Sequence, residues 1–128
     1  MNREKKILIV DDASFMRHML RRAMGKAGTY TILEAPDGET ALRLFREQRP
    51  DLVFLDISMP GMNGIEVLKQ LKQMDGRLPV LMCSAIGQER KIMEAMENGA
   101  ADFIVKPFKE EQIIEAVCHV FSAGKEGL

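Results

Sequence analysis

The chain has 128 residues, of which 46% are hydrophobic and 29% are charged, and its formal net charge is −1. This composition predicts one folded domain rather than a disordered chain, and it argues against a domain that binds nucleic acid by neutralising phosphates. The sequence contains no apolar run long enough to cross a membrane and no signal peptide, so we expect a cytoplasmic protein.

Short apolar segments alternate with longer amphipathic segments from end to end. In chain order, the predicted strands are residues 7–10, 30–33, 52–55, 80–83 and 103–105. The predicted helices follow them, around residues 15–23, 39–48, 68–71, 88–98 and 113–117, and a polar tail follows from residue 123. Glycines follow three of these helices and are expected to end them in the left-handed conformation: Gly28, Gly76 and Gly99.

Strands that are joined through helices must run parallel, and several of these strands are apolar without alternation. The predicted fold class is therefore α/β, with a parallel sheet covered by helices on both faces. We expect a single domain over residues 1–128, with a core from about residue 6 to 122.

Polar side chains follow four of the five predicted strands. They are Asp11 and Asp12, Asp56, Ser84 and Lys106. In an open parallel sheet the carboxyl ends of the strands share one edge, where ligands bind, so these side chains are predicted to form one cluster.

A cluster of three carboxylates needs a positive charge. At about 4 Å each pair of like charges costs about 4 kcal/mol at an effective dielectric constant near 20. Lys106 supplies one cation, and oxygen ligands favour Mg²⁺ as the second. With both cations beside it and the Ser84 hydroxyl within reach, Asp56 is predicted to accept a phosphoryl group.

Taken one at a time, these residues have simpler interpretations. Asp11 and Asp12 precede a helix and could cap it, Ser84 could form a turn, and Lys106 could be a solvated charge. Those separate needs do not explain why acids, a hydroxyl and an amine all follow successive strands at one edge of the sheet.

The chain resembles the receiver domains of bacterial two-component response regulators, and most closely single-domain chemotaxis regulators of the CheY kind. The resemblance covers residues 7 to about 120 and rests on four segments, "ILIVDD", "LVFLDISMPGMNG", "CSA" and "DFIVKPF". It implies a flavodoxin-like, doubly wound (βα)5 fold with strand order 2-1-3-4-5.

The resemblance also assigns roles to individual residues. Asp56 would be the phosphorylated aspartate, with Asp12 a direct ligand of Mg²⁺ and Asp11 helping to place the ion through water. The backbone carbonyl of Ser58 would complete the protein ligands. Lys106 would pair with the phosphoryl oxygens, and the bond from Lys106 to Pro107 is expected to be cis.

Ser84 and Phe103 would form the conformational switch of such a receiver. The hydroxyl would move to the phosphoryl group, and the aromatic ring would rotate into the vacated space. Threonine and tyrosine are more frequent than serine and phenylalanine at these two positions, so this chain lacks a methyl group and a ring hydroxyl there. Ser58 and Ile86 occupy positions that, in the family, tune the rate at which water removes the phosphoryl group.

The resemblance implies a signalling phosphoacceptor rather than an enzyme. The expected partners are a histidine kinase of the CheA kind as donor, the flagellar motor switch as target and a phosphatase, and the chain is expected to be a monomer. The fourth helix, fifth strand and fifth helix would form the face that partners read, within residues 86–96, 103 and 109–117.

Three other functions stay open at this point. The chain could be the receiver part of a longer transcriptional regulator, with residues 124–128 beginning a linker. A Mg²⁺-dependent phosphohydrolase would instead place its nucleophile first in an acidic pair that brackets one residue, whereas Asp11 and Asp12 are adjacent. A flavodoxin would need a phosphate-binding loop that "DDASF" does not provide.

The remaining reactive or adaptable side chains are expected to be structural. Cys83 and Cys118 lie in apolar segments and are predicted to be buried free thiols. His18 and His119 are isolated and predicted to be surface or interface residues. Five methionines fall on helices at core-like spacing, and packing in the core is favoured over an adaptable docking surface: Met16, Met19, Met24, Met93 and Met96.

Overall fold

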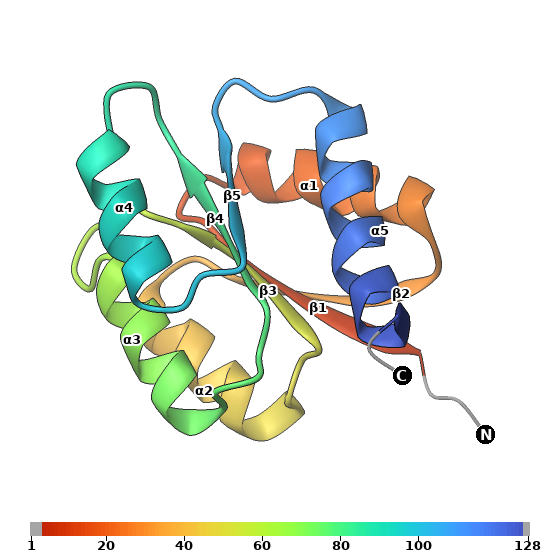
Figure 1. Cartoon of the computed structure of the whole chain (residues 1–128), viewed down its shortest axis with the longest axis horizontal. Helices are drawn as coiled ribbons and strands as arrows, with labels where there is room; N and C mark the ends of the chain where they lie inside the picture. The colour runs from red at the N-terminus through yellow and green to blue at the C-terminus, as the bar shows by residue number, and fades with distance from the viewer. Residues whose placement is uncertain (1–3, 127–128) are drawn as a thin grey trace.

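Strands and helices alternate along the whole chain, as the sequence predicts (Figure 1). The computed structural model describes residues 4–126. Its elements are β1 (Lys5–Val10), α1 (Ser14–Ala27), β2 (Tyr30–Ala35), α2 (Gly38–Gln48), β3 (Leu52–Asp56), α3 (Gly64–Met74), β4 (Val80–Ser84), α4 (Glu89–Glu97), β5 (Asp102–Val105) and α5 (Glu110–Glu126). No helix in this part of the chain is long and apolar enough to cross a membrane.

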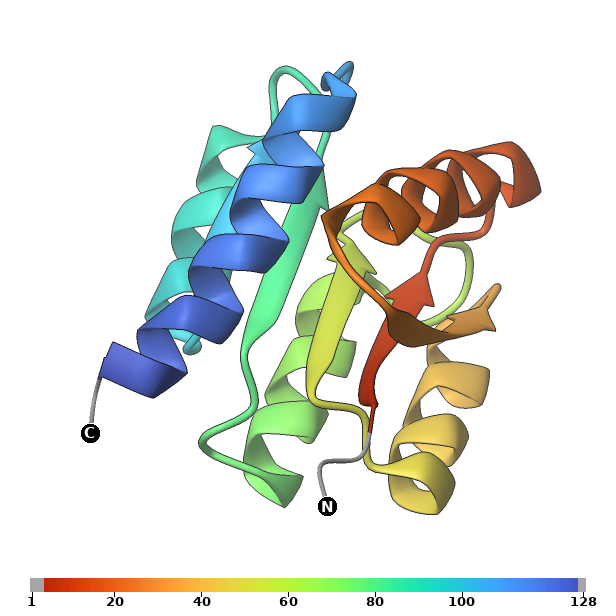
Figure 2. The same cartoon turned by 90° about the vertical axis from the view of Figure 1, so that its right-hand side faces the viewer.

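The strands form one parallel sheet in the order β2-β1-β3-β4-β5. Helices α1 and α5 cover one face of the sheet, and α2, α3 and α4 cover the other (Figures 1 and 2). The flavodoxin-like, doubly wound (βα)5 fold and its strand order are thus confirmed. From β1 the chain first moves to β2 on one side and then to β3 on the other side, so its direction across the sheet reverses between β1 and β3. A doubly wound sheet has its binding crevice at this point.

The three central strands are buried on both faces, which explains their continuous apolar runs. Successive residues of a strand point to opposite faces, so each central strand contributes to two cores. Leu8, Val53 and Met82 belong to the core under α2, α3 and α4. Ile9 and Phe54 belong to the core under α1 and α5.

Two of the three predicted glycine caps are wrong. Gly99 has a φ of 95° and follows α4 in the left-handed region. Gly28 is extended, because the chain runs straight from α1 into β2, and Gly76 does not adopt a positive φ. A left-handed cap that the sequence does not indicate follows α2, where the C-cap residue is Arg49 with a φ of 47°.

The predicted polar tail is also partly wrong, because α5 continues to Glu126. Residues 1–3 and 127–128, including the end of the possible linker, lie outside the described part of the chain, so the expected extent of the domain over 1–128 stays a prediction at both ends.

Three of the five methionines predicted to pack in the core are exposed. Met24 is fully buried and Met16 is partly buried, but Met19, Met93 and Met96 have exposed fractions of 38%, 62% and 40%. The helical spacing is correct in each case. Met93 and Met96 line a groove between α4 and β5 and do not lie in either core of the sheet.

Candidate functional site

The predicted polar cluster forms at the carboxyl edge of the sheet. Asp11, Asp56 and Lys106 each come two residues after a strand residue that packs in the core under α1 and α5. Because side-chain direction repeats every two residues along a strand, all three share one face. The parallel register places Asp11 beside Asp56, and Lys106 lies two residues beyond their level after β5. The sheet therefore joins residues that are up to 95 positions apart in the chain.

Lys106 lies between the two buried carboxylates. Its Nζ is 3.2 Å from Oδ2 of Asp11 and 3.4 Å from Oδ2 of Asp56. Asp11 is 1% exposed and Asp56 is 6% exposed, whereas the lysine side chain is 24% exposed. A cation held this close to two buried acids compensates charge that the protein interior would otherwise exclude.

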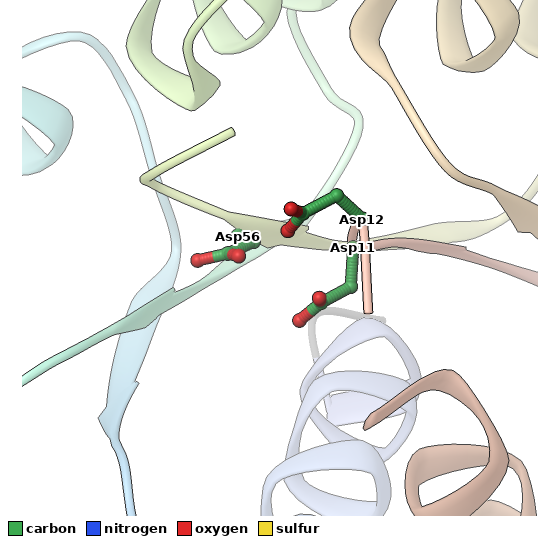
Figure 3. A group of neighbouring side chains, drawn as sticks. All are labelled: Asp11, Asp12 and Asp56. Carbon is green, nitrogen blue, oxygen red and sulfur yellow. The ribbon is translucent and has the colours of Figure 1, made fainter. Parts of the chain in front are cut away.

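Asp12 completes the acidic group from the solvent side. Asp11, Asp12 and Asp56 each offer a carboxylate oxygen, and these oxygens lie within 4.8 Å of one another. Figure 3 shows the three side chains gathered where β1 and β3 end. The donors are all oxygens, two are buried and one faces solvent, and this suits a hard cation that keeps some of its water, as Mg²⁺ does.

Burial and repulsion shape the ionisation of the site. The pKa of Asp56 is raised above its ordinary value, first because the carboxyl is buried and second because Asp11 is negative, and these effects outweigh the attraction of Lys106. Burial opposes the charged form of Lys106, but the neighbouring Asp56 and Asp11 raise its pKa overall. In the absence of metal the cluster is short of positive charge, which is consistent with a site for a divalent cation.

The loop after β3 is fixed directly beside Asp56. The backbone N–H of Ser58 donates to Oδ1 of Asp56 at 3.3 Å, and the N–H of Gly64 donates to the carbonyl oxygen of Ile57 at 2.8 Å. A Cβ at Gly64 would overlap the carbonyl oxygen of Asp56, so only glycine permits α3 to begin this close to the strand. Asn63 begins α3 by accepting a hydrogen bond from the N–H of Glu66.

Asp11 and Asp12 do not act as simple caps of α1. The N-cap residue of α1 is Ala13, and no side chain caps that helix. Oδ1 of Asp11 does accept a hydrogen bond from the N–H of Ala13 at 2.9 Å, but its Oδ2 faces Lys106. Asp11 therefore orients the loop and the lysine together. The guanidinium of Arg17 fixes the same loop by donating to the backbone oxygen of Asp11 at 2.7 Å.

The two residues expected to form the switch lie on neighbouring strands. Ser84 is fully buried at the end of β4, and its hydroxyl has no hydrogen-bond partner within the described residues. It does not contact Asp56 through a hydrogen bond here. Phe103 on β5 is 39% exposed, so its ring is not simply part of the core. The bond from Lys106 to Pro107 is cis, as expected.

The structural predictions for the isolated residues had mixed outcomes. His18 and His119 are exposed, as expected. Cys83 is buried on β4, and burial raises the pKa of its thiol to about 12. Cys118 is exposed on α5, so its predicted burial is wrong. The apolar residues around Cys118 in the sequence face α1 and the sheet, whereas this position is on the solvent side of the helix.

One residue near the site was missed by the sequence analysis. Gln88 was placed only as the start of a helix, yet its side chain joins the loop after β4 to the loop after β3. The sequence offers a weak local signal for the first of these contacts, since a glutamine three residues after a free backbone N–H can reach back to it. Nothing in the sequence indicates the second contact, because it links residues 30 positions apart.

Comparison with known proteins identifies the fold family. Residues 7–118 match the sequence profile of the response regulator receiver domain. The chain belongs to this family. The chemotaxis protein CheY of Bacillus subtilis (strain 168) is 46% identical over 112 residues, which cover 88% of this chain and 93% of that protein. The sporulation initiation phosphotransferase F of the same organism is 42% identical over 113 residues, with 88% and 90% covered.

Solved structures agree with this assignment. A crystal structure of NtrX from Brucella abortus matches 98% of this chain with a TM-score of 0.90 and 31% sequence identity. The match covers only 28% of the NtrX chain, so that protein is much longer than its receiver domain. Receiver domains of two-component systems are signalling phosphoacceptors with an acidic pocket for Mg²⁺, and they interact with histidine kinases and effectors.

Proposed function

We propose that this receiver domain accepts a phosphoryl group on Asp56 from a histidine kinase, and that the chain acts as a single-domain chemotaxis regulator. The observation that carries the proposal is the position of Lys106 between Asp11 and Asp56, with Asp12 beside them. A buried acid held next to an amine and an oxygen-lined cation site has the groups that phosphoryl transfer requires.

Each residue has a distinct task in this proposal. A carboxylate oxygen of Asp56 attacks the phosphorus of a phosphohistidine, the P–N bond breaks, and the histidine nitrogen keeps the electron pair and takes up a proton. Asp11, Asp12, Asp56 and the backbone carbonyl of Ser58 would hold Mg²⁺, which when bound neutralises charge on the phosphoryl oxygens. The ammonium group of Lys106 already contacts the attacking carboxylate, and it would then donate a hydrogen bond to a phosphoryl oxygen.

The unpaired hydroxyl of Ser84 supports its role as the switch residue. A buried hydroxyl without a partner costs free energy, and a phosphoryl oxygen on the neighbouring strand would supply the missing acceptor. Movement of Ser84 toward that oxygen would favour a different position of the Phe103 ring, and this would shift the population of the adjacent α4 and β5 arrangements.

An apolar groove beside the switch supports the proposed output face. It has a volume of about 590 Å³ and lies between α4 and β5. Ile86, Met93, Met96 and Phe103 line it, and each has an exposed fraction of at least 39%. Apolar side chains gathered in this way commonly mark a contact surface, and methionine adapts its shape to a partner. We propose the flagellar motor switch as the partner and a kinase of the CheA kind as the donor.

The acceptor site can be tested by incubating the protein with Mg²⁺ and acetyl phosphate and measuring its intact mass. We expect one phosphoryl group on the wild type, removed by hydroxylamine because an acyl phosphate is labile to it. Asp56→Asn should stay unlabelled. Asp75→Asn is a matched control, because Asp75 lies after α3 and outside the acidic cluster, and it should label as the wild type does.

The same experiment separates this proposal from a phosphohydrolase. Turnover of acetyl phosphate far beyond the slow loss of label, or of other phosphate esters, would favour an enzyme over a signalling phosphoacceptor. Stable label on Asp56→Asn would show that the acceptor is another residue, and the proposal would then be wrong.

The output can be tested by a pull-down with purified flagellar switch proteins. Beryllofluoride with Mg²⁺ mimics the phosphorylated aspartate, and we expect it to increase binding in the wild type but not in Asp56→Asn. Absence of binding in both conditions would favour the alternative of a receiver within a longer transcriptional regulator. The match to only 28% of the NtrX chain supports the possibility of a longer protein. Sequencing the gene past Leu128 would then show whether a second domain follows.

A further inference from the structure

Gln88 joins the two loops that lie on either side of the acceptor aspartate. Its Oε1 accepts a hydrogen bond from the backbone N–H of Ala85 at 2.6 Å, and its Nε2 donates to the hydroxyl of Ser58 at 2.5 Å. Ala85 directly follows Ser84 at the end of β4, and Ser58 lies two residues after Asp56 at the end of β3. One half-buried carboxamide therefore spans the gap between these two strand ends.

The position of Gln88 in the helix makes this contact informative. Gln88 is the N-cap residue of α4, where a polar side chain commonly accepts a hydrogen bond from an N–H of its own helix. It makes no such bond here, and both ends of its carboxamide are directed away from the helix instead. The side chain thus ties the N-cap position of α4 to the acceptor site.

We propose that Gln88 is a positioning residue that holds the unphosphorylated arrangement of the site and must release when a phosphoryl group is bound. This inference rests on the proposed function, since it concerns the same phosphoryl transfer to Asp56. The hydroxyl of Ser84 has no hydrogen-bond partner in the described part of the chain. Rotation of this side chain alone would leave the N–H of Ala85 in place, so the proposal requires the end of β4 to move toward the phosphoryl group together with the hydroxyl, which carries the peptide N–H of Ala85 with it. That movement strains or breaks the hydrogen bond from Ala85 to Gln88.

Release of Gln88 would also reach the output face. The next residue, Glu89, begins α4 and lines the apolar groove together with Ile92 and Met93. While the carboxamide is bound to both loops, the first turn of α4 is fixed relative to β3 and β4. Once it is released, that turn can shift and change the shape of the groove.

The test compares the wild type with Gln88→Met, which keeps the length of the side chain but forms neither hydrogen bond. Binding of beryllofluoride at saturating Mg²⁺ is measured by titration calorimetry. In the proposal, the two hydrogen bonds of Gln88 exist only before beryllofluoride binds. Their loss in Gln88→Met should therefore tighten beryllofluoride binding by about three- to tenfold, the range that one or two hydrogen bonds with modest net contributions give. Thermal unfolding of each variant checks that it is folded.

Gln112→Met is the matched control. Gln112 also accepts a backbone hydrogen bond from a residue three positions earlier, the N–H of Lys109 at 2.7 Å, and it does so at the start of α5. It contacts neither loop beside Asp56. We expect its beryllofluoride affinity to equal that of the wild type, which separates the loss of a loop-to-site contact from the general loss of a glutamine near a helix start.

A second measurement tests the two hydrogen bonds of Gln88 directly. Amide hydrogen exchange at Ala85 in the unmodified protein should be slower in the wild type than in Gln88→Met, and a double-mutant cycle with Ser58→Ala should be non-additive for beryllofluoride affinity. Ser58→Ala keeps the backbone carbonyl that is proposed to bind metal.

The possible failures are distinguishable. If the wild type does not bind beryllofluoride, the proposed function is wrong. If the wild type binds but Gln88→Met binds with equal or lower affinity, the acceptor site stands and the inference about Gln88 is overturned. Equal amide exchange at Ala85 in both proteins would also overturn it.

Discussion

Replacement of Asp56, the proposed acceptor, by asparagine should make the metal-free protein more stable. The asparagine keeps the shape of the side chain but removes a buried charge. In the wild type, a carboxylate oxygen of Asp56 lies within 4.8 Å of oxygens of Asp11 and Asp12, so each of these two repulsions is about 3.5 kcal/mol at an effective dielectric constant near 20. The attraction to Lys106 at 3.4 Å is about 5 kcal/mol on the same scale.

The two repulsions exceed the one attraction by about 2 kcal/mol, and screening of the exposed Asp12 reduces this difference. We expect Asp56→Asn to gain about 1 to 2 kcal/mol, which corresponds to a rise in Tm of about 5 °C for a domain of this size. The assay is urea and thermal unfolding in EDTA. Repetition with Mg²⁺ should stabilise the wild type by mass action and the variant by less.

The same comparison predicts a pH dependence. Folding raises the pKa of Asp56, so ionisation of this group weakens the folded state as the pH rises from the ordinary carboxyl range through the raised value. The advantage of Asp56→Asn should therefore be absent in acid and develop toward neutral pH. If the variant is less stable than the wild type in EDTA at neutral pH, the charge balance inferred for the site is wrong.

Three further predictions concern other positions. Gly64→Ala should lose about 2 kcal/mol or more, because the new Cβ meets the β3 backbone, whereas the helical Gly25→Ala, with nothing within 4 Å, should gain up to about 1 kcal/mol; urea unfolding compares them. Thiol reagents should label Cys118 in the native protein and Cys83 only on unfolding, since its pKa is about 12; equal labelling would contradict the burial. Burial opposes ionisation of Glu34, but Arg17 and Arg21 on α1 lower the pKa of its carboxyl overall. Glu34→Gln should therefore lower the free energy of unfolding by up to about 1 kcal/mol above the ordinary carboxyl pKa, and by nothing once the pH falls through the lowered value. A loss of stability that persists in acid would refute this.

The fold could be predicted because its signals are local. Apolar strands such as residues 52–55 are buried on both faces, and the helical periods between them leave a parallel sheet as the simple solution. The strand order came from resemblance to receiver domains, since alternation alone does not rank the strands. Gly28 shows the limit of local signals, because a glycine after a helix can end it in an extended conformation as well.

The candidate site could be predicted in its membership but not in its contacts. Asp11, Asp56 and Lys106 were found because they follow strands whose carboxyl ends share an edge. The lack of a partner for Ser84 and the bridge made by Gln88 depend on where two loops meet, and the exact course of a loop is not encoded in a periodic pattern.

The sequence by itself determined the succession of strands and helices, the two-sided burial of the central strands and the identity of the polar residues at their ends. Only the tertiary structure decided that Lys106 divides its contacts between two acids and that Met93 and Phe103 stay exposed beside a groove. The physical reason is one of range. Periodicity and propensity act over a few residues, whereas burial, charge balance and hydrogen bonding depend on neighbours that the folded chain brings from distant positions.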